Sequence, residues 1–351
     1  MKTWDAVIIG GGVIGLSCAL ELSRREIRVL IVERGEPGRE ASHAAGGMLA
    51  HCDPHTPEVL RPLAAASAAL YPELVLELKE ESGVHIDLRR EGVIAFFEHG
   101  ESPSCGHALS LDDIARLEPN VVPSGPGHFL PEATIDPRKL VEALGKAVHR
   151  RGVDVSSGSA VVAVEMFARK VTAVRTEKSR YLAPFVINCA GAWASSIAPV
   201  PFRTRPVKGQ MLAVVPPHHA HFPLRHVIRH GSCYLIPRSD GRIVIGSTVE
   251  EAGYDKHVDP AVIQSLHQRA AFLLPELGEG RILEAWSGLR PGTPDGLPML
   301  GETSFGGYLA ATGHFRDGIL LAPITGQVIA KLVCGETPEY DLLPFSAERF
   351  L

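Results

Sequence analysis

The chain has 351 residues, of which 45% are hydrophobic and 21% charged, a balance typical of ordinary globular proteins. That length exceeds what one hydrophobic core usually supports, so two domains are expected. The net charge of −5 and the lack of a sustained basic run argue against nucleic acid or an anionic membrane as the main partner, and favour a small molecule.

The N-terminal residues read as a strand, a glycine-rich turn, a helix and a second strand. The turn is Gly10-Gly11-Gly12-Val13-Ile14-Gly15, and the four segments span residues 6–9, 10–15, 16–25 and 29–32. In such a unit Gly10 permits a tight turn, Gly12 lets the backbone approach a pyrophosphate, and Gly15 lets the helix pack closely on the strand. Glu33 follows the second strand, where a carboxylate can bind both ribose hydroxyls and repel a 2′-phosphate. The pattern predicts a dinucleotide without that phosphate.

A run of small residues follows, Ala41-Ser42-His43-Ala44-Ala45-Gly46-Gly47-Met48-Leu49, which is too poor in apolar bulk for a core strand. We interpret it as backbone that passes closely over a flat cofactor, with the Ser42 hydroxyl available to a phosphate. Gly46 and Gly47 would then offer unobstructed amides. A surface loop or the start of an alanine-rich helix is the alternative.

The middle of the chain alternates helical and β-like segments. Helices are expected over residues 62–82 and 137–150, with Asp136 as the N-terminal cap of the second. Short apolar or alternating runs predict strands over residues 93–97, 153–164, 171–175, 185–189, 211–215, 234–237 and 242–246. The last two strands are joined by the turn Arg238-Ser239-Asp240-Gly241.

This alternation predicts the α/β class, with a Rossmann-like dinucleotide-binding domain into which a second, β-rich (mixed-sheet) substrate domain is inserted discontinuously. The first domain is expected to comprise residues 1–82, 135–199 and 286–351, and the substrate domain residues 83–134 and 200–285. Topology of this kind places the ligand between the two domains.

A second strand, glycine turn and helix lie near the C-terminus, in Gly307-Tyr308-Leu309-Ala310-Ala311-Thr312-Gly313-His314-Phe315-Arg316-Asp317-Gly318. The helix is expected to begin near Ile319, so that its N-terminus points at the cofactor. That end carries roughly half a positive charge, which would stabilise negative charge on a reduced ring. A flavin suits this arrangement better than a nicotinamide.

The remaining chemistry-bearing residues predict neither a metal site nor a disulfide. The cysteines show no C-x-x-C and no zinc-ligand spacing, which predicts reduced thiols in a cytoplasmic protein. The group His51-Cys52-Asp53-Pro54-His55 is interpreted as lining a pocket entrance, and His218, His219 and His221 as solvent-exposed loop residues. No segment approaches the ~20 apolar residues of a membrane span.

Together with Trp286-Ser287-Gly288-Leu289-Arg290-Pro291-Gly292-Thr293-Pro294-Asp295-Gly296, these signatures resemble the FAD-dependent D-amino-acid oxidase superfamily, and within it the glycine oxidases of bacterial thiamine biosynthesis. The resemblance runs from Asp5 to about Val333. It implies a non-covalent FAD held by positions matching Val13, Ile14, Glu33, Arg34, Ala41, Ser42, Gly46, Gly47, Met48, Val161, His314, Phe315, Arg316, Asp317, Gly318, Ile319 and Leu320.

The resemblance also implies a substrate site. The arginine matching Arg290 would hold the substrate carboxylate, the tyrosine matching Tyr234 would assist it, and Arg316 would lie on the substrate side of the flavin. We expect Arg290 to lie in a rigid turn between Leu289 and Pro291. Arginine suits the recognition of an amino acid because its planar guanidinium can bind a carboxylate through two hydrogen bonds. A structural salt bridge at Arg290 and a half-buried strand aromatic at Tyr234 are the alternatives.

The implied reaction is the oxidative deamination of glycine, sarcosine or small D-amino acids to the 2-oxo acid, with dioxygen reduced to hydrogen peroxide. Some glycine oxidases have histidine at the position of Ser232 and methionine at that of Val249, so the substrate preference stays open. Other readings are a D-amino-acid dehydrogenase that reduces a quinone, a non-catalytic FAD-binding protein, and an NAD-dependent dehydrogenase. We also expect a homo-oligomer.

Overall fold

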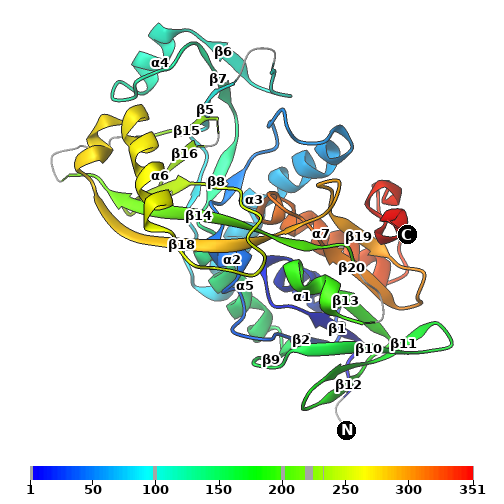
Figure 1. The fold of residues 1–351 in the computed structure, drawn as a ribbon. Helices are drawn as coiled ribbons and strands as arrows, with labels where there is room; N and C mark the ends of the chain where they lie inside the picture. The colour runs from blue at the N-terminus through cyan, green and yellow to red at the C-terminus, as the bar shows by residue number, and fades with distance from the viewer. Residues whose placement is uncertain (1–2, 98–100, 199–201, 218–223, 232, 351) are drawn as a thin grey trace.

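The computed structural model describes residues 3–97, 101–198, 202–217, 224–231 and 233–350 (Figure 1). Its first layer is a six-stranded sheet in the order β19-β20-β13-β1-β2-β9, with every neighbouring pair parallel except β19 and β20. The strands are β1 (Ala6–Ile9), β2 (Val29–Val32), β9 (Asp154–Ser156), β13 (Phe185–Asn188), β19 (Met299–Glu302) and β20 (Tyr308–Thr312). Strands β1 and β2 are unbroken apolar runs because both of their faces are buried.

Helices cover one face of this sheet and share a hydrophobic core with it. They are α1 (Val13–Arg24), α3 (Arg61–Ser82), α5 (Pro137–Arg150) and α7 (Gly318–Val333). Helices α1 and α7 approach closely, since a Cβ at Gly326 would lie 2.7 Å from the Ser17 carbonyl oxygen. Asp136 caps α5 as predicted, because its carboxylate accepts hydrogen bonds from the amides of Arg138 and Lys139.

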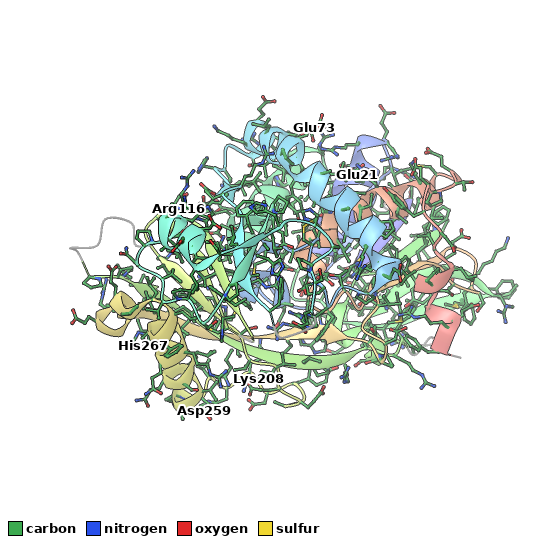
Figure 2. All side chains as sticks on the ribbon, turned by 90° about the horizontal axis from the view of Figure 1, so that it is seen from above. Glu21, Glu73, Arg116, Lys208, Asp259 and His267 are labelled. Atoms are coloured by element: carbon green, nitrogen blue, oxygen red, sulfur yellow. A yellow bond between two sulfur atoms is a disulfide. The ribbon has the colours of Figure 1, made fainter. Side chains whose placement is uncertain are left out.

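The second layer is an eight-stranded mixed sheet in the order β18-β14-β17-β16-β15-β5-β7-β6. Its strands are β5 (Val93–Phe96), β6 (His107–Leu109), β7 (Gly127–Leu130), β14 (Arg205–Val215), β15 (Val227–His230), β16 (Cys233–Pro237), β17 (Ile243–Gly246) and β18 (Arg281–Gly292). One face packs on α6 (Pro260–Leu273), as the core formed by Leu212, Ile245 and Leu266 shows. In Figure 2, Asp259 and His267 mark α6 on the side of the molecule away from Glu73 of α3.

Two small sheets complete the fold. One comprises β10 (Val161–Phe167), β11 (Lys170–Thr176) and β12 (Arg180–Leu182), and packs on the other face of the six-stranded sheet. The other comprises β3 (Met48–Leu49), β4 (Leu88–Arg89) and β8 (Ala133–Ile135). The single strand predicted over 153–164 was wrong: β9 and β10 belong to different sheets, and the chain turns between them at Gly158, which has φ +66°.

The predicted fold class is confirmed by the parallel sheet with its helices and by the separate mixed sheet. The mixed sheet takes strands from both segments assigned to the substrate domain, and β18 runs across the proposed boundary at 285–286. The division into two domains stays a prediction.

The sequence analysis predicted no membrane span, and this stays a prediction. The helical stretch Glu58–Ser82 is long and apolar enough, by length and composition alone, to cross a membrane. Its buried residues include Leu63, Tyr71, Leu74 and Leu78, which recur at helical spacing and belong to the core shared with α5 and α7. The composition of α3 therefore reflects one face packed against neighbouring helices.

Candidate active site

A cavity of about 790 Å3 lies between the carboxyl ends of the parallel strands and the eight-stranded sheet. Residues at the ends of β1, β2, β13 and β20 line one side, and residues of β14, β16 and β18 line the other. Ligands of open parallel sheets bind outside the carboxyl ends of the strands. The volume falls within the roughly 300–1,000 Å3 of typical ligand sites.

The glycine-rich turn forms one end of the cavity. Gly10 has φ +103°, and a Cβ there would lie 2.5 Å from the Cys189 carbonyl oxygen, so only glycine fits. Gly12 is the N-cap of α1 and lines the cavity. Gly15 does not line it, and a Cβ there would lie 2.0 Å from the Gly10 carbonyl oxygen. Gly15 therefore provides close packing between helix and turn.

Glu33 lies beside this turn with 8% of its surface exposed. Its carboxylate accepts hydrogen bonds from the amides of Gly11 and Gly35, both at 2.8 Å, and lines the cavity. The Val13 amide donates to Ser42 Oγ at 2.9 Å, which joins the start of α1 to the following small-residue segment. The two hydrogen bonds to Glu33 hold an anionic group at the end of β2, where the sequence predicted it.

Aromatic residues that the sequence analysis missed lie next to this end. The Arg34 guanidinium lies 3.4 Å from the centroid of the Trp193 ring, and Tyr254 stacks on the same ring at 5.5 Å. Arg34 also donates to Glu40 at 2.6 Å. Arg34 and Trp193 both line the cavity. Trp193 follows the predicted strand 185–189, but no local pattern indicates that it approaches Arg34.

The small-residue run combines a short helix, α2 (Ala41–Ala44), with strand β3. Gly47 has φ +75°, and a Cβ there would lie 1.9 Å from the Ile135 carbonyl oxygen. A Cβ at Gly46 would lie 3.3 Å from the Tyr234 ring. The run therefore passes closely over its neighbours, and the helical alternative holds only for its first four residues.

The N-terminus of α7 faces the cavity, as Gly318 and Ile319 line it. Burial lowers the pKa of His314 to about 3, so the ring is neutral, and its Nε2 lies 3.1 Å from Thr325 Oγ1. Burial also raises the pKa of Asp317 to about 6, although the Arg316 guanidinium opposes that shift. The helix N-terminus itself favours negative charge at this end of the cavity, whereas the neutral His314 ring contributes no charge.

Arg290 lies inside strand β18, so the predicted rigid turn was wrong. Its Nη1 donates to the Thr248 carbonyl at 3.1 Å and its Nη2 to Ser247 Oγ at 2.6 Å. The guanidinium lies over Gly209 of β14, where a Cβ would lie 2.2 Å from Nη1. No ion pair with Arg290 occurs among the described residues. A fixed cation facing a cavity is suited to binding a carboxylate.

Tyr234 lies on β16, next to the strand that ends beside Ser247. It is half-buried, it lines the cavity, and its hydroxyl lies 3.8 Å from Met211 Sδ. A Cβ at Gly246 would lie 2.8 Å from that hydroxyl, so the neighbouring strand leaves room for it. Tyr234 and Arg290 thus line the same cavity.

A charged cluster that the sequence analysis did not identify lies around Asp53. Arg229 donates to Asp53 at 2.8 Å, and Arg316 lies 3.9 Å from the same carboxylate. Burial opposes ionisation of Asp53, but Arg229 holds its pKa below the usual value. Burial raises the pKa of the neighbouring Glu132 to about 7. Asp53 belongs to the group predicted to line a pocket entrance, and both it and His55 line the cavity.

The prediction that all cysteines are reduced was wrong. Cys52 and Cys105 form a disulfide, with their Cα atoms 5.2 Å apart, whereas Cys18, Cys189, Cys233 and Cys334 are free. The spacing of the two cysteines gave no signal, because 53 residues separate them and only the folded chain brings them together. His218, His219, His221 and Ser232 lie outside the described residues.

The structure brings most of the predicted site residues to this one cavity. Arg290, Tyr234 and Arg316 line it, whereas Gly15 and Leu320 do not. The predicted cofactor residues that line it are Gly10, Gly12, Val13, Ile14, Glu33, Arg34, Ala41, Ser42, Gly46, Gly47, Met48, Val161, His314, Phe315, Arg316, Asp317, Gly318 and Ile319. Leu320 lies in the core, and its carbonyl accepts a hydrogen bond from Ser67 at 2.6 Å.

Comparison with known proteins agrees with this geometry. A family model described as FAD dependent oxidoreductase (DAO) matches residues 5–332. The crystal structure of glycine oxidase from Geobacillus kaustophilus matches with a TM-score of 0.93 and 32% identity, covering 100% of both chains.

Two curated relatives have other names. The bifunctional protein ThiO/ThiG of Synechocystis sp. is 37% identical over 359 residues, which cover 99% of this chain and 54% of that protein. The chain thus spans about half the length of this relative. The hydrogen cyanide synthase subunit HcnC of Pseudomonas aeruginosa is 34% identical over 408 residues, which cover 99% of this chain and 97% of that protein.

Proposed function

Because the chain belongs to the family of FAD-dependent oxidoreductases, we propose that it is an amino-acid oxidase acting on glycine, sarcosine or small D-amino acids. With glycine, dioxygen and water as reactants, the products are glyoxylate, ammonia and hydrogen peroxide. The observation that carries this proposal is Arg290, a cation without an acidic partner in the described structure, which faces the same cavity as the glycine-rich turn.

The residues present fit an FAD at this cavity. A Cβ at Gly12 would project toward Ser42 Oγ, 3.3 Å away, so glycine keeps open the space beside the start of α1. We assign the diphosphate to that helix N-terminus and the adenosine ribose to Glu33. FAD, when bound, supplies an acceptor for the two electrons of the substrate and passes them to dioxygen. Cys189 is the one cysteine among the described residues that line the cavity, and we propose that the cofactor is bound without a covalent bond.

The protein's own part is to orient the substrate. Arg290 would bind the carboxylate through guanidinium N–H groups, and Ser247 and Thr248 keep that group from rotating. The Tyr234 hydroxyl would donate a further hydrogen bond to the carboxylate. Arg316 carries 51% side-chain exposure and lies near Asp53, and we assign it to the substrate side of the cavity. This arrangement needs no general base of unusual pKa, because the substrate amine can bind neutral.

The likeness to glycine oxidase over both whole chains supports the substrate class. A role in thiazole formation for thiamine belongs to the proposal, as do a cytoplasmic location and a homo-oligomeric state. The HcnC likeness supports a second candidate, in which glycine oxidation by this chain contributes to cyanide formation.

A substrate panel tests the proposal. The purified yellow protein is mixed with glycine, sarcosine, D-alanine, D-proline and L-alanine, and peroxide and cyanide are measured in parallel. We expect peroxide from one or more of the first four and none from L-alanine. Cyanide from glycine would favour the second candidate, and dye reduction without oxygen uptake would favour a dehydrogenase.

A further inference from the structure

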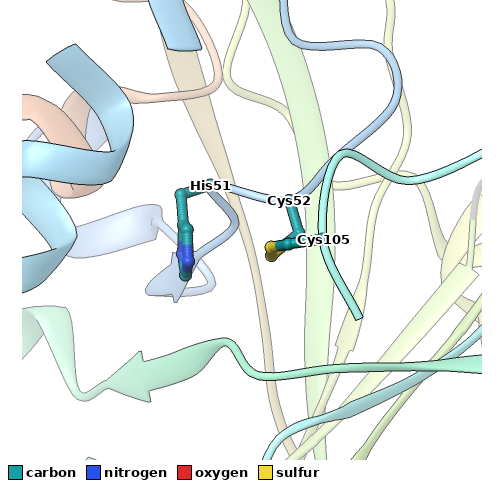
Figure 3. A group of neighbouring side chains, drawn as sticks. All are labelled: His51, Cys52 and Cys105. Atoms are coloured by element: carbon teal, nitrogen blue, oxygen red, sulfur yellow. A yellow bond between two sulfur atoms is a disulfide. The ribbon is translucent and has the colours of Figure 1, made fainter. Parts of the chain in front are cut away.

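The bonded pair Cys52 and Cys105 lies at the edge of the cavity, with the His51 ring beside the two sulfur atoms (Figure 3). One ring nitrogen and both sulfur atoms lie within 4.8 Å of one another. Ala50, two residues before Cys52, and Asp53, directly after it, both line the cavity.

We propose that Cys52 and Cys105 are a dithiol that hydrogen peroxide from the adjacent cavity oxidises reversibly to the disulfide. The choice of hydrogen peroxide as the oxidant rests on the proposed function, whereas the cysteine pair and its geometry are independent of it. Disulfides in cytoplasmic proteins are usually transient or redox-sensing, which agrees with the location proposed above.

The two cysteines stay close when the bond is open, because other contacts hold their segments together. The Ser104 amide donates to the Cys52 carbonyl at 3.1 Å, and the Ser104 hydroxyl lies 3.4 Å from the His51 carbonyl. His55 Nε2 lies 2.9 Å from a carboxylate oxygen of Glu101, which also lines the cavity. A Cα separation of 5.2 Å lies within the range in which a disulfide closes without backbone movement.

Burial decides which sulfur reacts first. Cys52 has no exposed surface, whereas Cys105 is half-buried. We therefore assign the attack to Cys105 and the second step to Cys52.

The reaction balances without a further reagent. The Cys105 thiolate attacks one peroxide oxygen, so that an S–O bond forms, the O–O bond breaks and water leaves after proton uptake. The Cys52 thiolate then attacks the Cys105 sulfur, the S–O bond breaks, and a second water leaves. Two thiols lose two electrons in total, and one peroxide gains them.

The four other cysteines are less suited to this reaction, although Cys189 lines the cavity. Cys18 and Cys189 are buried, and burial together with the hydrogen bond between the two side chains raises the pKa of Cys189, which disfavours the reactive thiolate. Burial raises the pKa of Cys233 to about 11. Cys334 is exposed but free, which makes Cys334→Ser the variant that removes unrelated surface oxidation.

The first test uses peroxide and no substrate. Holoenzyme of the Cys334→Ser variant is reduced, freed of reductant and treated with a small excess of hydrogen peroxide, and thiols are then titrated in denaturant. Of its five thiols we expect three to remain, with Cys52 and Cys105 joined in a non-reduced peptide digest. In the matched variant Cys105→Ser/Cys334→Ser no such joined peptide forms, and a dithiol reductant restores all five thiols of the parent.

The second test replaces added peroxide by turnover with glycine, with and without catalase. We expect the pair to close without catalase and to stay open with it. Closure by added peroxide but not by glycine would leave the redox pair standing and remove the proposed source of peroxide. Failure of added peroxide to join the two residues would overturn the inference. It would also be overturned by reduced protein that retains one Zn2+ per chain and loses it in His51→Ala, because the cluster would then be a metal site.

Discussion

At the scale of single residues, the proposed substrate site depends on Arg290, whose guanidinium is held in place by hydrogen bonds and still faces the cavity. Arg290 donates to Thr248 and Ser247, and these two bonds fix its plane without neutralising its charge. The family resemblance predicted Arg290 and Tyr234, the glycine-rich unit predicted Glu33, and all three line the cavity. Sequence reasoning missed Asp53 and Arg229 as a pair because 176 residues separate them, so only folding reveals their contact.

We expect Arg290→Met to lower kcat/KM for glycine by roughly one and a half to three and a half decades. The reason is that truncating one partner of a buried charge pair costs about 2–5 kcal/mol. FAD should stay bound, and Arg290→Lys should recover only part of the loss, because a lysine offers no planar fork. A small amine that lacks a carboxylate is the control. Equal losses on glycine and the amine would assign Arg290 to the fold or the flavin instead.

Gly12→Val should yield colourless protein, since its side chain would fill the space beside Ser42 Oγ that we assign to the diphosphate. Glu33→Ala should bind FAD weakly, because it removes charge-assisted hydrogen bonds of roughly 1.5–3 kcal/mol each. Gly145→Val is the matched control, as nothing lies within 4 Å of a Cβ there. The measurement is flavin absorbance per chain after gel filtration. Wild-type FAD content in Gly12→Val would remove this turn from the site.

At the scale of elements, local signals in the sequence predicted helices and strands well. They failed where pairing between strands that are distant in the sequence determines the local structure. Asp136 and Pro137 form a complete local signal for the start of α5. Pro291, in contrast, suggested a turn after Arg290, yet it lies in β18. Proline is tolerated there because β18 is the edge strand of its sheet, and its partner opposite is Pro206 of β14.

Asp136→Ala should lower the free energy of unfolding by about 0.5–2 kcal/mol, the usual cost of losing an N-cap. Two amide donors at the start of α5 lose their acceptor in this variant. Asp136→Asn should restore most of the loss, because its side-chain oxygen still accepts. Urea denaturation followed by far-UV circular dichroism measures both. If Asn and Ala were equally destabilising, the effect would come from the neighbouring Arg242, 3.7 Å away, rather than from the cap.

At the scale of the whole molecule, the cavity brings together segments from both ends and the middle of the chain. Most of the residues that the sequence predicted to bind the cofactor line it, because each signature carries a local reason to approach a cofactor. The disulfide, the Asp53 cluster and Trp193 could not be predicted, since each depends on how the sheets pack together.

Buried titratable groups at and near the cavity make the free energy of unfolding depend on pH. The pKa of His314 is about 3 in the folded protein against a reference value of 6.5. The contribution of the buried neutral ring to the free energy of unfolding is therefore complete above pH 6.5 and is lost as the pH falls. Between pH 6.5 and 5 we expect a loss of about 2 kcal/mol from this group. Glu132 and Asp317 act in the opposite direction, because their raised pKa values make ionisation destabilising as the pH rises.

His314→Gln isolates this effect. Urea denaturation of both proteins with a fixed excess of FAD should show that the wild type loses more stability between pH 6.5 and 5 than the variant does. We expect this difference because unfolding of the wild type takes up one proton more than unfolding of the variant. Parallel pH profiles would mean that His314 titrates normally in the folded protein.

The most direct test of the central claim is the colour of the flavin when glycine is added to the holoenzyme under anaerobic conditions. We predict that its visible absorbance bleaches, and that admitting air restores the yellow colour with release of one hydrogen peroxide per flavin. A flavin that stays yellow with glycine, sarcosine and every small D-amino acid would contradict an amino-acid oxidase. A flavin that bleaches but recovers only with a quinone would contradict the use of dioxygen.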